Sequence, residues 1–212
     1  MNADYEGEMM ATFVALEKKH DISGRVRQFI DASVRYHGFP APGVILGAYM
    51  VDLALEKLGA EPGDRLFAVA ETAKCVSDSI GVITGCTPGS SKFLLFNTGR
   101  IALAVGRDDG TGIARCVRAY VVCERTRSYP ALRAWYFNEP DAKGNLPALL
   151  EDILVAGRGI LGWERVDVPI PPKDDQWKPA ICASCGEMVP DKMLVGDRCR
   201  ACSAGSCYME KK

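Results

Sequence analysis

The sequence predicts an α+β protein made of two unequal domains, and three observations lead to this prediction. The 212 residues suffice for one domain of about 150 residues with its own hydrophobic core and for a second, smaller domain. Stretches with apolar residues at helical spacing alternate irregularly with short apolar strands, which indicates a mixed sheet flanked by helices. The tail contains two Cys-x-x-Cys pairs, a pattern typical of a small domain built around a metal ion.

Two helices joined by an irregular turn are expected at the start of the core. Apolar residues recur at helical spacing over residues 24–36 and again over residues 44–58, where Gly59 ends the pattern. The turn between them, His37 to Gly43, contains two prolines and two glycines, which exclude regular structure and restrict the path of the backbone. A turn of this rigidity is suited to a functional site.

Strands and two further helices complete the predicted core. A short strand at residues 65–71 leads into a helix over residues 76–84. Further strands are expected at residues 93–96, 101–106, 113–122 and 161–168, and a helix capped by Asn145 is expected at residues 146–156. Because the proline-rich residues 169–176 read as a linker, we expect a core domain at residues 1–172 and a linker with the metal domain at residues 173–212.

The cysteine pairs of the tail predict one structural zinc ion. Cys182 and Cys185 are separated by thirteen residues from Cys199 and Cys202, and four thiolates can surround a tetrahedral zinc at about 2.3 Å per bond. Two disulfides are the alternative, but an odd total of nine cysteines suits a reducing compartment, so zinc and a cytoplasmic location are favoured. Cys207 is not expected to be a ligand, because four thiolates already complete the site.

The overall charge excludes simple electrostatic functions. A net charge of −1 and a pI of about 6.2 offer no bulk attraction to nucleic acid or to an anionic membrane. The most apolar stretch, residues 44–51, is interrupted by Asp52 and is too short for a membrane span of roughly 18 residues. The acidic N-terminus does not resemble a secretory leader.

Candidate chemistry in the core is concentrated in three segments, which we expect to contribute to one cleft. The candidate residues are His37, Glu71, Cys75, Asp78 and Cys86. Cys75 comes at the entrance to a predicted helix and beside Lys74, and both the helix dipole and the lysine favour a thiolate. A buried structural role for Cys75, and a hydrogen-bonded structural role for His37, remain open alternatives.

Other cysteine functions are less favoured. If the segment between Cys75 and Cys86 is helical, the two residues are separated by roughly 16 Å, too far for a disulfide. Cys116 and Cys123 are expected on or near one strand, with no assigned role.

These segments resemble motifs of the FmdE family, proteins of molybdenum and tungsten formylmethanofuran dehydrogenase operons. Four motifs occur here in the family order: His37-Gly38-Phe39-Pro40-Ala41-Pro42-Gly43, Glu71-Thr72 with Cys75 and Asp78, Thr84-Gly85-Cys86-Thr87-Pro88-Gly89, and Gly99-Arg100. The tail begins Cys182-Ala183-Ser184-Cys185-Gly186-Glu187, similar to the treble-clef zinc domain that many members carry. The resemblance implies a thioredoxin-like core with a five-stranded mixed sheet.

The departures from the family pattern bear on function. Phe39 and Ala41 stand where the family has a histidine and a cysteine, and residues 90–92 replace its Lys-Gly-Asn sequence. The donors that remain would hold zinc or nickel weakly, so we expect the metal site of the core to be vacant. The resemblance implies an accessory or regulatory protein that binds an unidentified small molecule, with redox centres in other subunits.

Two other functions compete with this interpretation. One is a thiol-dependent enzyme that uses Cys75 with His37 and Asp78 as acid, base or orienting group. The other is an adaptor that binds a protein through the zinc finger; nucleic acid is a poorer partner, because residues 178–212 hold six lysines and arginines against four acidic residues. A homodimer is also expected.

Overall fold

A computed structural model describes residues 3–140, 142, 144–172 and 176–205. The chain divides into two compact units, Met1–Pro171 and Pro172–Lys212. Among the described residues, no helix combines the length and the hydrophobicity that crossing a bilayer requires.

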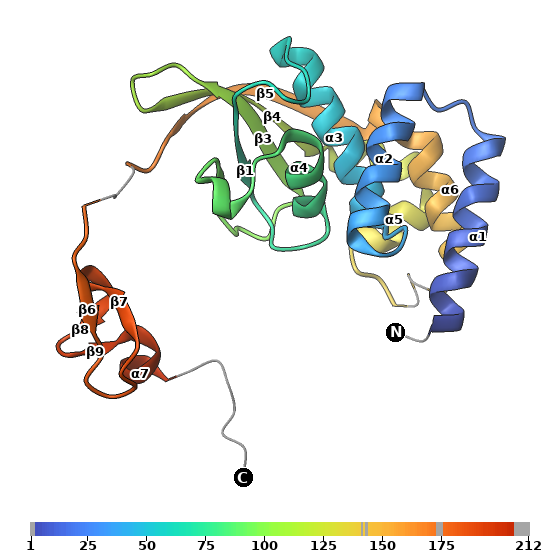
Figure 1. The fold of residues 1–212 in the computed structure, drawn as a ribbon. Coiled ribbons are helices and arrows are strands. Elements are labelled where there is room, and N and C mark those ends of the chain that lie inside the picture. The colour runs from blue at the N-terminus through green and yellow to red at the C-terminus, as the bar shows by residue number, and fades with distance from the viewer. Residues whose placement is uncertain (1–2, 141, 143, 173–175, 206–212) are drawn as a thin grey trace. The chain divides into compact units, whose positions relative to one another are not determined.

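A five-stranded mixed sheet lies at the centre of the larger unit (Figure 1). Its strand order is β2-β1-β3-β4-β5; β1 and β2 run parallel, and the other neighbours run antiparallel. The strands are β1 (Leu66–Ala70), β2 (Phe93–Leu95), β3 (Ala102–Asp108), β4 (Ile113–Val121) and β5 (Leu161–Pro169). The α+β class with a five-stranded mixed sheet is therefore confirmed.

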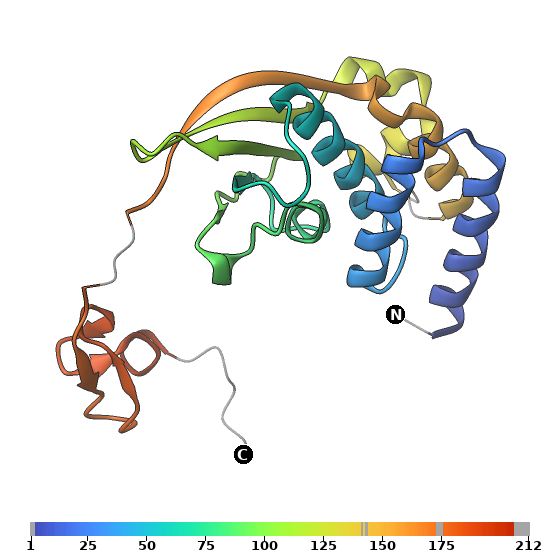
Figure 2. The same ribbon diagram turned by 45° about the horizontal axis from the view of Figure 1, so that its top comes forward.

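Helices cover one face of this sheet and extend beyond its end (Figures 1 and 2). They are α1 (Ala3–Lys19), α2 (Gly24–His37), α3 (Pro42–Leu58), α4 (Val76–Thr84), α5 (Pro130–Tyr136) and α6 (Leu146–Ala156), with 3₁₀ helices η1 (Pro88–Ser90), η2 (Cys123–Ser128) and η3 (Gly157–Ile160). α3 packs on β3 and β4, and α4 packs on β1. α6 contacts α1, α3 and α5, so these helices form a group beside the sheet.

α3 is the central helix and is buried continuously from Gly43 to Leu55. Its backbone approaches α4 closely, because a Cβ atom added at Gly47 would lie 2.8 Å from Ser79 Oγ. Ser79 Oγ donates a hydrogen bond of 2.9 Å to the Val44 carbonyl. The glycine and this hydrogen bond together hold the N-terminal ends of α3 and α4 next to each other.

Two helical segments were not assigned from the sequence. α1 carries Met9, Phe13 and Leu16 at helical spacing, and Phe13 is almost fully buried. η2 and α5 together cover most of the chain between Cys123 and Tyr136, and each is too short to show a clear period. Both segments matter because they contribute to the pocket described below.

The smaller unit consists of two short hairpins and one short helix. Its elements are β6 (Pro179–Ile181), β7 (Met188–Pro190), η4 (Asp191–Met193), β8 (Leu194–Val195), β9 (Arg198–Cys199) and α7 (Arg200–Ala204). Among its described residues, Cys182 and Cys199 alone are buried. This unit therefore lacks an apolar core that could stabilise it.

Glu17 makes the stability of the larger unit depend on pH. Its side chain is buried, and its Oε1 atom has no hydrogen-bond partner. Burial, reinforced by the charge of Asp31, raises the pKa of Glu17 above its usual value. Because the folded pKa is raised, the stabilising contribution is present below the unfolded pKa and is lost as pH rises through the folded pKa.

We therefore expect Glu17→Gln to increase the free energy of unfolding at pH 7 by about 1 kcal/mol, since the amide avoids burying a charge. At pH 4 the gain should be smaller. Chemical denaturation at both pH values measures the effect, and the exposed Glu8→Gln on the same helix is the control. An equal gain at both pH values would show that the charge of Glu17 is not the cause.

Candidate functional site

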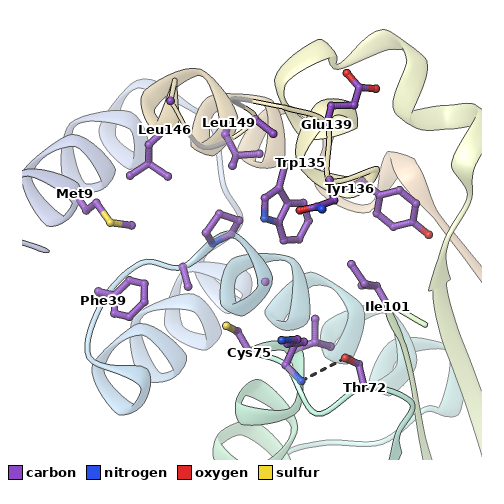
Figure 3. Close-up of a pocket in the computed structure, with 18 of the residues that line it drawn as sticks. Met9, Phe39, Thr72, Cys75, Ile101, Trp135, Tyr136, Glu139, Leu146 and Leu149 are labelled. Atoms are coloured by element: carbon purple, nitrogen blue, oxygen red, sulfur yellow. Dashed lines mark hydrogen bonds between the residues drawn. The ribbon is translucent and has the colours of Figure 1, made fainter. Parts of the chain in front are cut away.

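A pocket of about 910 Å³ opens between α1, α5 and α6 on one side and the N-terminal ends of α3 and α4 on the other (Figure 3). Its wall is formed by Met9, Phe39, Ala41, Pro42, Gly43, Thr72, Lys74, Cys75, Val76, Gly99, Ile101, Trp135, Tyr136, Asn138, Glu139, Ala142, Gly144, Leu146 and Leu149. The volume lies in the range of small-molecule sites, roughly 300–1,000 Å³.

The interior of the pocket is mainly apolar. In Figure 3, Leu146 and Leu149 approach it from α6, Met9 from α1, and Trp135 from α5. Polar groups lie near Thr72, whose Oγ1 accepts a hydrogen bond of 3.3 Å from the backbone N–H of Lys74. Such a wall can enclose an organic ligand that also carries a polar group.

The aromatic part of the wall is held by α5. Pro130 occupies the first turn of this helix, and Asp152 of α6 accepts hydrogen bonds from the N–H groups of Ala131 (2.8 Å) and Leu132 (3.1 Å). A carboxylate at a helix N-terminus both accepts from otherwise unpaired N–H groups and complements the helix dipole. Asp152 therefore positions Trp135, and the pocket wall does not depend on a loose loop at this point.

Cys75 lies where the ends of α3 and α4 meet. It is the N-cap residue of α4, and its sulfur faces the pocket in Figure 3. A Cβ atom added at Gly43 would lie 3.1 Å from the Cys75 Cβ, so only a residue without a side chain leaves this approach unhindered. The helix N-terminus predicted for Cys75 is thus present.

His37 and Asp78 form a pair beside the pocket and do not line it. His37 Nδ1 lies 2.7 Å from Asp78 Oδ2, and the imidazole ring packs against Phe39, with 4.7 Å between ring centroids. Phe39 and Ala41, the positions where the resemblance suggests metal donors, contribute apolar surface to the wall. The pair therefore acts on the pocket by supporting Phe39.

Glu71 supports the opposite wall. Its carboxylate forms ion pairs with Arg118 and with Arg100, the latter at 2.8 Å. Burial raises the pKa of Glu71, but the hydrogen bonds and charge of Arg118 outweigh this effect and hold the pKa below its usual value. The Glu71 carbonyl also accepts from the N–H of Thr98 at 2.9 Å, which fixes the segment that presents Gly99 and Ile101 to the pocket.

The other core cysteines lie away from the pocket wall. Cys86 is 1% exposed within the hydrophobic core, and burial raises the pKa of its thiol. Cys116 is buried on β4, where burial raises its pKa to about 12. Cys123 lies near a strand, two residues after the end of β4; it begins η2 and is exposed, with its sulfur 3.8 Å from Tyr136 Oη.

Of the five core candidates, Cys75 alone contributes to the described wall. Sequence reasoning missed Met9, Trp135 and Tyr136. The helical spacing of apolar residues in α1 could have indicated Met9. For Trp135 and Tyr136 the one indication was Pro130, a residue typical of the first turn of a helix.

Limited alkylation should modify Cys75 before the other cysteines outside the tail. The position at the helix N-terminus is the physical reason, since the dipole favours the thiolate. Iodoacetamide labelling across a pH series, measured by peptide mass spectrometry on the zinc-loaded protein, checks this. Earlier modification of the exposed Cys123, or an inert Cys75, would contradict it and exclude the thiol-enzyme alternative.

Four cysteines of the smaller unit form a potential metal centre. The sulfur atoms of Cys182, Cys185, Cys199 and Cys202 all lie within 4.8 Å of one another, and those of Cys185 and Cys199 are 4.0 Å apart. Four ligands at about 2.3 Å from one ion require separations of roughly 3.8 Å, so the arrangement fits a tetrahedral ion. Cys207 lies outside the described residues.

The backbone prepares one of these thiols for metal binding. The N–H of Cys199 donates to Cys182 Sγ at 3.2 Å, and this bond is the main cause that lowers the pKa of Cys182 to about 6. A thiolate is the form that coordinates metals. Among the described residues, no second group of three such side chains, including those around His37 and Cys75, gathers as closely.

Comparison with known proteins decides the family. A family model described as "FmdE, Molybdenum formylmethanofuran dehydrogenase operon" matches residues 36–168, more than half of the chain. The chain belongs to the FmdE family. The part matched to FmdE runs from the end of α2 through most of β5 and includes Phe39, Cys75 and Trp135.

A solved structure and a sequence relative are also similar to this FmdE protein. A tungsten formylmethanofuran dehydrogenase FmdE-like protein from Syntrophus aciditrophicus is similar with a TM-score of 0.71 and 29% identity, over 87% of this chain and 95% of that one. A protein of Archaeoglobus fulgidus, described as a probable S-adenosyl-L-methionine-binding protein, is 30% identical over 206 residues. That match covers 82% of this chain, which spans about half (51%) of the relative.

Proposed function

We propose that this FmdE protein is an accessory protein of a formylmethanofuran dehydrogenase-type system and that its core pocket binds an S-adenosyl compound. The pocket of about 910 Å³ carries the proposal, because it combines a suitable volume with an apolar wall and a few polar groups. The name of the Archaeoglobus relative supports the ligand, and the family supports the system. Catalysis by this chain alone is not part of the proposal.

Calorimetric titration of the full-length protein with S-adenosylmethionine tests the ligand. We expect saturable binding of one molecule per chain, and native mass spectrometry should detect the same complex. Leu149→Trp, which places a bulky ring on the wall, should reduce binding. The control is Val155→Trp on the exposed face of the same helix, where 54% of the residue is accessible. The ligand assignment fails if neither method detects binding.

For the smaller unit, we propose a structural zinc of the treble-clef kind. The sulfur separations suit a tetrahedral ion of this size. A first Cys-x-x-Cys turn, then the β8–β9 hairpin and the short helix α7, is an order that supports the treble-clef type. Zinc would be held by Cys182, Cys185, Cys199 and Cys202. It would replace the apolar core that the unit lacks.

An adaptor role for the zinc unit is a second candidate function, and its exposed apolar side chains favour it. Ile181 and Met188 lie opposite each other on β6 and β7 and are 64% and 55% exposed, and Val195 is 60% exposed. Pull-down of the purified components of formylmethanofuran dehydrogenase tests this role. Ile181→Ser with Met188→Ser should abolish retention, whereas Val155→Ser on α6 should not. Homodimerisation stays a prediction, which analytical ultracentrifugation would check.

A further inference from the structure

The two ends of the core pocket differ in chemistry. Trp135, Leu146 and Leu149 form an apolar end, while Thr72 and Cys75 lie at the other (Figure 3). Lys74, which precedes Cys75 in the chain, also belongs to the wall. Lys74 has the only cationic side chain among the described lining residues, and Glu139 has the only carboxylate. In Figure 3 the Glu139 carboxylate points away from Cys75 and Thr72.

Lys74 places a cationic side chain at this end of the pocket, and the described carboxylates nearest to it in the sequence already have other partners. Glu71 is paired with Arg118 and Arg100, and Asp78 is paired with His37. Among the residues the structure describes, no carboxylate forms an ion pair with Lys74. Thr72 is 3% exposed, and its hydroxyl proton remains able to donate to a ligand while the oxygen accepts from the Lys74 N–H.

The opposite end presents a flat aromatic surface. Trp135 is partly buried against the core, and Asp152 holds its helix through the N–H groups of Ala131 and Leu132. The other tryptophans, Trp163 and Trp177, do not line the pocket and are about half exposed. Indole rings bind planar heterocycles by stacking, with little dependence on which base is present.

We infer that the pocket binds its ligand in one orientation, with a planar heterocycle stacked on Trp135 and a carboxylate directed to Lys74 and Thr72. This inference rests on the proposed function and adds to it the two groups by which the ligand is recognised. The site would favour compounds that combine a planar heterocycle, such as adenine, with a tail that carries a carboxylate. A compound with the same ring but no acidic tail would bind more weakly.

Two thioethers test the orientation, because both contain adenosine and they differ in the tail. S-adenosylhomocysteine carries an amino-acid tail with a carboxylate, whereas 5′-methylthioadenosine has no such tail. We expect the wild-type protein to prefer S-adenosylhomocysteine by about three- to tenfold, a modest ratio because Lys74 is exposed to solvent. Lys74→Met should remove this preference, and about 0.5 M salt should reduce it in the wild type.

Substitutions of Trp135 test the aromatic end of the pocket. Trp135→Leu should weaken both thioethers by roughly tenfold, and Trp135→Phe should weaken them less because a ring remains. Lys57→Met and Trp163→Leu are matched controls, since these residues contact each other away from the pocket and their loss should not change affinity. Circular dichroism of each variant confirms folding before titration.

The outcomes separate this inference from the proposed function. If S-adenosylmethionine and both thioethers fail to bind, the proposed ligand class and the orientation are both wrong. If they bind but Lys74→Met keeps the preference for the acidic tail, the orientation is wrong and the ligand class stands. If Trp135→Leu leaves affinity unchanged, stacking on Trp135 is excluded.

Discussion

Removal of the metal should unfold the smaller unit and leave the larger unit folded. Cys182 and Cys199 are the buried residues among those described in this unit, so no apolar core can replace the ion. Structural zinc in isolated fingers contributes about 10–16 kcal/mol at pH 7, far more than other contacts in a unit of this size could supply. Chelation should therefore disorder the chain after about residue 179, whereas the core sheet and α3 keep their hydrogen bonds.

Metal analysis combined with hydrogen exchange measures this result. The intact protein should contain one zinc, and Cys199→Ser should lose it and lose exchange protection across β6 to α7. Cys123→Ser, an exposed thiol of the core, is the matched control and should retain the ion. Full zinc retention by Cys199→Ser, or loss of zinc on Cys207→Ser, would contradict the ligand assignment. A single cooperative transition of the whole chain would contradict independent units.

Gly47→Val should be the most destabilising single substitution among those considered in the core. A Cβ at this position would lie 2.8 Å from Ser79 Oγ, closer than real Cβ contacts allow, and 3.1 Å from the Val76 carbonyl oxygen, which is tighter than most such contacts. α4 would have to move away from α3, which breaks the Ser79 to Val44 hydrogen bond and opens the packing beneath Cys75. The expected cost is about 3 kcal/mol, a large part of a typical stability of about 5–15 kcal/mol.

Urea denaturation compares this variant with Gly7→Ala. Gly7 also lies inside a helix, but no atom lies within 4 Å of a Cβ added there, so alanine should stabilise the protein by roughly 0.5–1 kcal/mol. Gly47→Ala should have the opposite sign despite the better helix propensity of alanine. If both alanine variants stabilise the protein, the close approach of α3 and α4 does not constrain this core.

The elements with long periodic patterns or clear end signals were predictable from the sequence. α4 ends at Thr84 as predicted, with Gly85 in a left-handed conformation (φ 70°). Asn145 caps its helix as predicted, and its side chain accepts from the Ala148 N–H at 3.2 Å. α1 was not predicted, although Met9, Phe13 and Leu16 recur in it at helical spacing. α5 could not be predicted, since seven residues are too few to define a period and its stability comes from Asp152.

The sequence indicated which residues could take part in a site, but it did not indicate which of them line the pocket. The position of Cys75 at a helix N-terminus was predictable, because a strand followed directly by a helix limits where the first helical turn begins. Glu71 and Cys86 lie near it in the sequence, yet β1 directs Glu71 to Arg118 and the turn after α4 buries Cys86 in the core. Sequence proximity could not reveal these directions; for Glu71 the deciding partner, Arg118, lies 47 residues away in the chain.

The cysteine spacing of the tail was sufficient to predict that its four cysteines come together, because thiols in two short loops can reach one point without help from distant residues. The pocket of the core depends instead on tertiary structure. Met9, Trp135 and Leu149 come from α1, α5 and α6, and Cys75 caps α4. α1 and α5 pack on α6, whereas α4 packs on α2, α3 and β1. Local sequence patterns specify single elements, whereas a cavity exists only where several elements pack together and leave space between them.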